Sequence, residues 1–369
     1  MKQNAKQIVY LFLTLFIFAV FTPTIEIHET DLEAAGRQFA TLDTILEKRQ
    51  NYFNPEQSKG LNRLVNILIV PGHDDEHWGA EFRGTKEVEL NRIVAEYLYE
   101  YLAQEEGINP VLASDESGYN PIFEKYFRRE EDKIEKFIND MKKNFSKKVE
   151  EDNFKQVEKN FHNTAPDEVV YRLYGINRWV NNQKFDLVIH IHFNDHAGRK
   201  RNHSGKYEGF SIYTPGKLFS NYEVSRKLAD NVFEELKKIR PVSNLEEEKE
   251  GVIEDHELIA VGANESLEAG SILIEYGYIY EPTFFKSTLR NTALDYFAYA
   301  TYVGVKKFLN ESPKQKEVQE VQTLKNKTSQ SNLIWQFNRA LDGKYPPKGK
   351  TLRDCPISGY FGECSKLVK

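Results

Sequence analysis

The chain has 369 residues, of which 40% are hydrophobic, so it is long enough for one large domain with its own core and for further segments. Its formal net charge of -6 gives no support for nucleic-acid binding, since proteins of that class usually carry a basic patch. The two cysteines lack the spacing of a zinc ligand set. Cys355 and Cys364 could form a small disulfide in an oxidising compartment or remain two separate thiols.

Residues 1–27 have the pattern of an export signal. Lys2 and Lys6 precede an apolar run from Ile8 to Phe21, as in a signal peptide or a membrane anchor. Because no small-residue cleavage site follows cleanly, we favour an uncleaved anchor over a cleaved signal. Both readings predict an extracytoplasmic protein, with residues 28–62 as a juxtamembrane spacer.

The first informative stretch begins with an apolar run, Ile67 to Val70, that predicts a buried strand. The proline and glycine that follow end this strand, which places His73 at its carboxyl end, where α/β sheets keep their sites. Glu87 falls in the first turn of the helix predicted next. A histidine and a glutamate at neighbouring element ends can converge on one zinc ion. Alternatively, His73 is a solvated loop histidine, and Glu87 is an acid that only complements the dipole of its helix.

A strand at Asn109–Ala113 is followed by an unusual segment, residues 119–163, that is rich in Lys, Glu, Asp, Phe and Asn. Apolar residues recur in it at helical spacing, which predicts one or two charged surface helices inserted into the domain. Such helices could be a solvated hairpin without a role, or a lid or regulatory element over the site.

The second informative stretch, Phe185–Asp195, is another apolar strand, and three of its last residues are polar candidates for a site. His190 and His192 are two positions apart and therefore share one face of the strand. His192 lies nearer the strand end and is the better metal ligand. His190 could instead orient neighbouring groups.

Glu275 directly follows a third apolar run, Ser271–Ile274, and is expected at the carboxyl end of that strand. A carboxylate there is costly unless it is paired, open to a cleft or close to a cation. The position suits a general base, although a glutamate that merely tops a strand in solvent gives the same pattern.

Strand ends in chain order thus carry His73, His192 and Glu275, and here the chain resembles the zinc-dependent N-acetylmuramoyl-L-alanine amidases, the peptidoglycan-cleaving enzymes of bacterial cell walls. That family has a strand ending in Pro-Gly-His with Gly-Ala shortly after, a glutamate four residues before an asparagine, a strand ending Ile-His-x-Asn, and an apolar strand followed by Glu-x-Gly. The matching residues are Pro71, Gly72, His73, Gly79, Ala80, Glu87, Asn91, Ile191, His192, Asn194, Glu275 and Gly277.

The resemblance implies a single three-layer α/β domain over residues 63–310, with a mixed, mostly parallel central sheet and helices on both faces. It implies Zn²⁺ bound by His73, Glu87 and His192, with Glu275 acting on the catalytic water. Asn194 and His190 would contact substrate or orient the ligands. The reaction implied is hydrolysis of the amide between N-acetylmuramic acid and L-alanine in peptidoglycan.

The resemblance also raises the hypothesis that the 119–163 segment blocks the site until an activator protein acts on it, because some family members carry an inserted helix in a comparable place. The chain differs from the family in three ways. Acids at positions 74–76 follow the first histidine where glycine is usual, His190 replaces a serine, and no arginine stands near Ala113.

Two other functions stay open. His73 and Glu76 have the H-x-x-E spacing of zinc carboxypeptidases, with His192 as a possible third ligand. The other reading is a non-catalytic, wall-associated protein with a degenerate site.

Residues 311–331 are polar and predicted to be a linker, and 332–369 form a tail that could dock on the domain, the wall or a partner.

Overall fold

The apolar run that was expected to form the first buried strand does form it, as β1 (Val65–Pro71). The structure is a computed structural model that describes residues 64–151, 165–285 and 287–310. The expected signal or anchor, the spacer, the linker, the tail and both cysteines lie outside the described residues. Within those ranges no helix combines the length and the apolar character that a membrane span needs.

The sheet is mixed and mostly parallel, as expected. Its six strands have the order β4-β1-β7-β10-β8-β9, and of its hydrogen-bonded pairs only β10 with β8 is antiparallel. The further strands are β4 (Ile108–Leu112), β7 (Leu187–Asn194), β8 (Ser211–Pro215), β9 (Val252–Asp255) and β10 (Gly270–Tyr278). Because β1, β7 and β10 are parallel neighbours, their carboxyl ends meet at one edge of the sheet.

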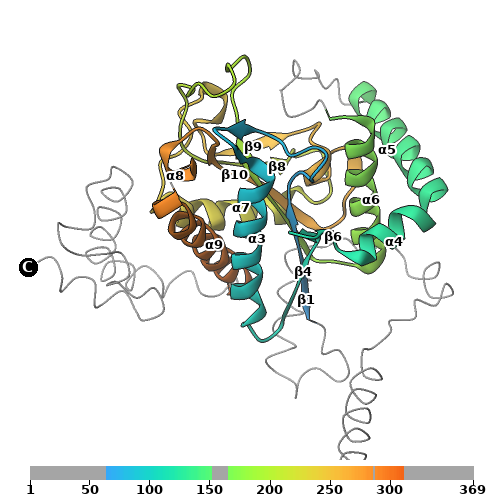
Figure 1. Cartoon of the computed structure of the whole chain (residues 1–369). Helices are drawn as coiled ribbons and strands as arrows, with labels where there is room; N and C mark the ends of the chain where they lie inside the picture. The colour runs from blue at the N-terminus through green and yellow to red at the C-terminus, as the bar shows by residue number, and fades with distance from the viewer. Residues whose placement is uncertain (1–63, 152–164, 286, 311–369) are drawn as a thin grey trace, which may run out of the picture. The chain divides into compact units, whose positions relative to one another are not determined.

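Helices cover both faces of this sheet, which confirms the three-layer expectation (Figure 1). One layer holds α3 (Glu87–Ala103), α7 (Tyr222–Leu236) and α9 (Ser287–Asn310). The other holds α4 (Pro121–Arg129), α5 (Glu131–Glu151) and α6 (Asp167–Gln183). Alternate residues of β1 enter the two cores, Ile67 on the α3 side and Leu68 on the α6 side. Burial on both faces explains why the strand is apolar without interruption.

Within the 119–163 segment, α4 and α5 differ from the expected solvated surface helices in one respect. Phe123 and Ile134 are fully buried, in the same core cluster as Trp179 of α6. The charged residues lie on the opposite side, so these helices form part of the second layer of the domain.

Shorter elements are β2 (Glu81–Phe82), β3 (Thr85–Lys86), β5 (Ser114–Asp115), β6 (Gly118–Tyr119), α8 (Pro282–Phe285), η3 (Glu246–Glu248), η4 (Ile259–Val261) and η5 (Ala263–Glu265).

Candidate metal centre

His73 lies two residues after the end of β1, and the two neighbouring elements β7 and α3 hold the glycine before it. The backbone N–H of Gly72 donates to the Ile191 carbonyl of β7 at 2.9 Å, and Asn91 Nδ2 of α3 donates to the Gly72 carbonyl at 2.8 Å. His73 has φ of 70°, in the left-handed region that few non-glycine residues adopt. This turn brings its Nε2 to 3.1 Å from Oε2 of Glu87.

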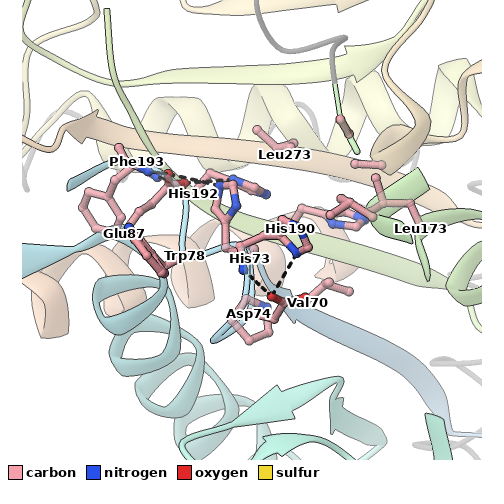
Figure 2. A pocket seen from close by; sticks show the side chains of 18 of the residues that line it. Val70, His73, Asp74, Trp78, Glu87, Leu173, His190, His192, Phe193 and Leu273 are labelled. Atoms are coloured by element: carbon pink, nitrogen blue, oxygen red, sulfur yellow. Dashed lines mark hydrogen bonds and ion pairs between the residues drawn. The ribbon is translucent and has the colours of Figure 1, made fainter. Parts of the chain in front are cut away.

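Glu87 is the first residue of α3, and its buried carboxylate lies between two imidazoles (Figure 2). Its Oε2 accepts from the Ala80 N–H at 2.9 Å, and its Oε1 accepts from the Phe193 N–H at 3.1 Å. Nδ1 of His192 lies 3.0 Å from the same Oε1. Burial opposes the charge, but the His73 and His192 imidazoles hold the pKa of Glu87 well below its usual range.

His73, Glu87 and His192 thus each offer one ligand atom, and these atoms all lie within 4.8 Å of one another. Two imidazole nitrogens and one carboxylate oxygen are a donor set that suits zinc. Glu76, which the carboxypeptidase reading needs, lines the same cavity but does not belong to this group; its side chain is exposed and groups instead with His77 and Glu168.

Two glycines make room for this arrangement. A Cβ on Gly72 would lie 2.2 Å from the His192 ring, and one on Gly79 would lie 2.3 Å from Oε2 of Glu87 and 2.5 Å from the His73 ring. Gly79 also has φ of +74°, where a side chain would be strained. The Pro-Gly-His and Gly-Ala patterns of the sequence therefore have a steric cause at this site.

Glu275 lies beside His192 in the parallel pairing of β10 with β7, and both side chains line the same cavity. The sequence predicted that this strand would end at Glu275. In the structure β10 instead continues to Tyr278, after a register shift in its pairing with β7. Burial, together with the negative charges of Glu87 and Glu248, raises the pKa of Glu275 well above its usual range. A carboxyl group with a raised pKa binds a proton more readily than an ordinary glutamate, which suits a group that takes up and returns a proton.

The two polar neighbours proposed from the sequence differ in their contacts. His190 is fully buried. Burial, followed by the nearby His192, lowers the pKa of His190 to about 3, so this imidazole is neutral. Asn194 lines the cavity, and its Nδ2 donates to Oε1 of Glu248 at 2.8 Å.

The acids after His73 order the loop and hold an arginine that sequence reasoning missed. Asp74 Oδ1 accepts from the backbone N–H groups of Glu76 and His77 at 3.0 and 2.7 Å. Asp74 Oδ2 accepts from Arg172 of α6 at 2.7 Å. Arg172 stands in an amphipathic helical stretch and Glu248 in an acidic run, so no local pattern singled them out.

A cavity of about 750 Å³ connects these groups. The three candidate ligands, Glu275 and Asn194 line it, together with a wall of apolar side chains, Val70, Leu173, Ile176, Leu258 and Leu273. Of the described part of the 119–163 segment, only Tyr119 lines the cavity, and no residue of α4 or α5 does so.

Solved structures similar to this chain include several amidases. The N-acetylmuramoyl-L-alanine amidase from Clostridium difficile 630 is 16% identical, with 68% of this chain and 99% of that chain covered and a TM-score of 0.43. The CwlD amidase from Clostridioides difficile, solved in complex with the GerS lipoprotein, is 18% identical, with 66% and 98% covered and a TM-score of 0.43. Ami1 from Mycobacterium smegmatis is 13% identical, with 68% and 99% covered and a TM-score of 0.44.

A comparison with curated proteins gave no match. The model of the N-acetylmuramoyl-L-alanine amidase family matches residues 67–307, which is more than half of the chain and takes in the whole of the cavity described above. The chain therefore belongs to the N-acetylmuramoyl-L-alanine amidase family.

Proposed function

We propose that this amidase acts on peptidoglycan with one zinc ion held by His73, Glu87 and His192, and with Glu275 as the proton carrier. The bond is the amide between N-acetylmuramic acid and L-alanine, the bond for which the family is named. The observation that carries the proposal is the convergence of three ligand atoms within 4.8 Å, from three segments of the chain.

The residues present fit a catalytic zinc site. Such sites use three protein ligands and keep one position open, and two histidines with one glutamate are an established set. When bound, zinc supplies Lewis acidity that polarises the amide carbonyl and lowers the pKa of a water molecule to about 7. The Ala80 and Phe193 N–H groups hold the Glu87 carboxylate in place for this role.

Glu275 is the group that would move the proton. It is buried beside His192 and lines the cavity, so a water held there lies within its reach. As the water oxygen attacks the carbonyl carbon, its proton passes to the Glu275 carboxylate. Glu275 then gives a proton to the leaving nitrogen as the C–N bond breaks. The products are a lactyl carboxylate on the glycan and a free amino group on L-alanine.

Place and partners follow from the substrate. Since peptidoglycan lies outside the cytoplasm, an exported or membrane-anchored protein agrees with the pattern of residues 1–27. An activator that acts on the 119–163 segment stays a prediction. Among the described residues α4 and α5 do not line the cavity, whereas Tyr119 and residues of α6, among them Arg172 and Leu173, do, so these are the described groups that could pass such an effect on.

The test is digestion of purified peptidoglycan by the full chain, with and without a chelator and with zinc restored. We expect new N-terminal alanine and free lactyl carboxylate, lost with chelator and recovered with zinc. Release of a carboxyl-terminal amino acid would instead favour the carboxypeptidase reading with Glu76. Zinc binding without release of any product would favour the non-catalytic reading.

A further inference from the structure

Glu248 is a buried acid in a run of exposed ones. The sequence Glu246-Glu247-Glu248 forms η3, and only Glu248 of the three is buried, with 1% of its surface exposed. A buried carboxyl group is costly unless several hydrogen bonds satisfy it. The exposed neighbours Glu246 and Glu247 need no such partners, so the burial of Glu248 has to be explained by what it contacts.

The partners of Glu248 come from three different strands. Asn194 Nδ2 of β7 and the Tyr213 hydroxyl of β8 donate to Oε1 at 2.8 and 2.7 Å. The Tyr278 hydroxyl of β10 donates to Oε2 at 3.0 Å. Of these partners Asn194 lines the cavity, whereas Glu248, Tyr213 and Tyr278 are not among the residues that line it. Among the hydrogen-bond partners of Glu248 described here, Asn194 is thus the one that reaches the cavity.

We propose that Glu248 is a positioning residue that fixes the amide of Asn194 with its carbonyl oxygen toward the cavity, where it accepts an amide N–H of the substrate. This inference rests on the proposed function, because the cavity is taken as the peptidoglycan site. The substrate is rich in such donors, since both its N-acetyl groups and its peptide stem carry amide N–H groups.

The orientation follows from the chemistry of the two side chains. A carboxylate accepts hydrogen bonds and cannot donate them, so it selects the N–H₂ end of an asparagine amide. In the reversed orientation Oδ1 of Asn194 would face Oε1 of Glu248, and two acceptor oxygens would meet without a hydrogen between them in a buried place. The Tyr213 hydroxyl, which shares Oε1, keeps that oxygen in position. Glutamine at position 248 would offer both an acceptor and a donor, and the amide orientation would no longer be set.

The test is a double-mutant cycle with Asn194→Ala and Glu248→Gln, measured as kcat and KM on a soluble N-acetylmuramoyl peptide. Loss of one hydrogen bond to substrate should raise KM roughly two- to tenfold in Asn194→Ala, with little change in kcat. Glu248→Gln should raise KM by no more than this. In KM the double variant should equal Asn194→Ala, because Glu248 reaches the substrate through Asn194. The charge of Glu248 also raises the pKa of Glu275, so kcat is not the readout for the positioning role. Effects on KM that multiply, or an unchanged KM in Glu248→Gln, would overturn the proposal.

Glu247→Gln, on the exposed side of the same turn, is the matched control and should leave both constants unchanged. If Glu248→Gln does not fold, Tyr213→Phe takes its place, with a smaller KM increase that must vanish in the Asn194→Ala background. A wild-type protein that releases no N-terminal alanine would remove the proposed function and this inference together. An active wild type with multiplicative effects would remove the positioning role alone.

Discussion

Nδ1 of His192 lies 3.0 Å from Oε1 of Glu87, although the two residues are 105 positions apart in the chain. The contact exists because β7 pairs in parallel with β1, and because α3 begins just after the loop that follows β1. Placing both residues at one edge of the sheet gives the site a rigid support. Its ligands can therefore converge before any ion binds, which lowers the conformational cost of binding.

Replacing Glu275 by glutamine separates metal binding from proton transfer. The amide keeps the shape of the carboxyl group but cannot accept a proton from water. We expect zinc content to stay near one ion per chain while kcat falls roughly 10²- to 10⁴-fold. Metal analysis and product release measure the two quantities. Full activity in Glu275→Gln would remove Glu275 from the mechanism.

Glu87 and Glu76 are the two acids that compete for the role of metal ligand. Glu87 lies between the imidazoles, whereas Glu76 is exposed and 3.8 Å from Arg172. Loss of a group that only hydrogen-bonds to a metal ligand typically lowers metal affinity roughly 10- to 100-fold. Because Glu87 would itself be a ligand, Glu87→Ala should lower zinc affinity by more than this. Glu76→Ala should leave the zinc affinity unchanged. The reverse result in a zinc titration would support the carboxypeptidase-like ligand set.

Gly79→Ala should disturb the ligands directly. The added Cβ would meet Oε2 of Glu87 at 2.3 Å, so the carboxylate or the loop has to move and zinc binding should fall. Gly84 is the matched control, because it also has positive φ, at +83°, but nothing lies within 4 Å of its added Cβ. Gly84→Ala should cost about 1–2 kcal/mol from backbone strain alone. Thermal unfolding and zinc titration of both variants give the comparison, and equal zinc affinity in the two would contradict it.

Asp295 gives a pH dependence of stability away from the metal centre. The Tyr101 hydroxyl of α3 donates to Oδ1 of Asp295 on α9 at 2.6 Å. Burial raises the pKa of Asp295, and the bond from Tyr101 offsets this only in part. The folded state thus favours the protonated form of Asp295, and this preference stabilises the protein at low pH. The stabilisation is complete below the unfolded pKa of about 3.9 and is lost as the pH rises through the pKa of the folded state.

Asp295→Asn keeps the acceptor for Tyr101 without the charge. We expect the variant to unfold at a higher temperature than the wild type at pH 7, and the difference to shrink as the pH approaches 4. Thermal unfolding at several pH values measures it. A difference that grows toward low pH would show that the sign is wrong.

Phe123 tests whether α4 is part of the fold or an appended surface helix. Its ring is fully buried and lies 4.6 Å from that of Trp179, measured between centroids. Phe123→Ala should lower the free energy of unfolding by about 3–5 kcal/mol. The neighbouring Ile122 is 53% exposed, so Ile122→Ala should change it by less than about 0.5 kcal/mol. Similar small effects in denaturant titrations of both would mean that α4 does not belong to the core.

The amino-acid sequence determined the central strands and the site candidates toward their carboxyl ends, and its resemblance to the amidase family gave the sheet type. An apolar run bounded by proline or glycine is a local signal, and strands buried on both faces need such runs. His73, Glu87, His192 and Glu275 could be proposed as one site because parallel strands bring their ends together. The convergence of the first three within 4.8 Å agrees with that reasoning.

The tertiary structure alone decided which charged residues are buried. Glu248 and Glu247 are adjacent in one acidic run, and only the packing of η3 against β7, β8 and β10 buries the first and exposes the second. Likewise, Glu76 and Glu87 are both acids near His73, and only the start of α3 puts Glu87 between the imidazoles. Burial of a polar group depends on partners far away in the chain, and a local pattern carries no information about them.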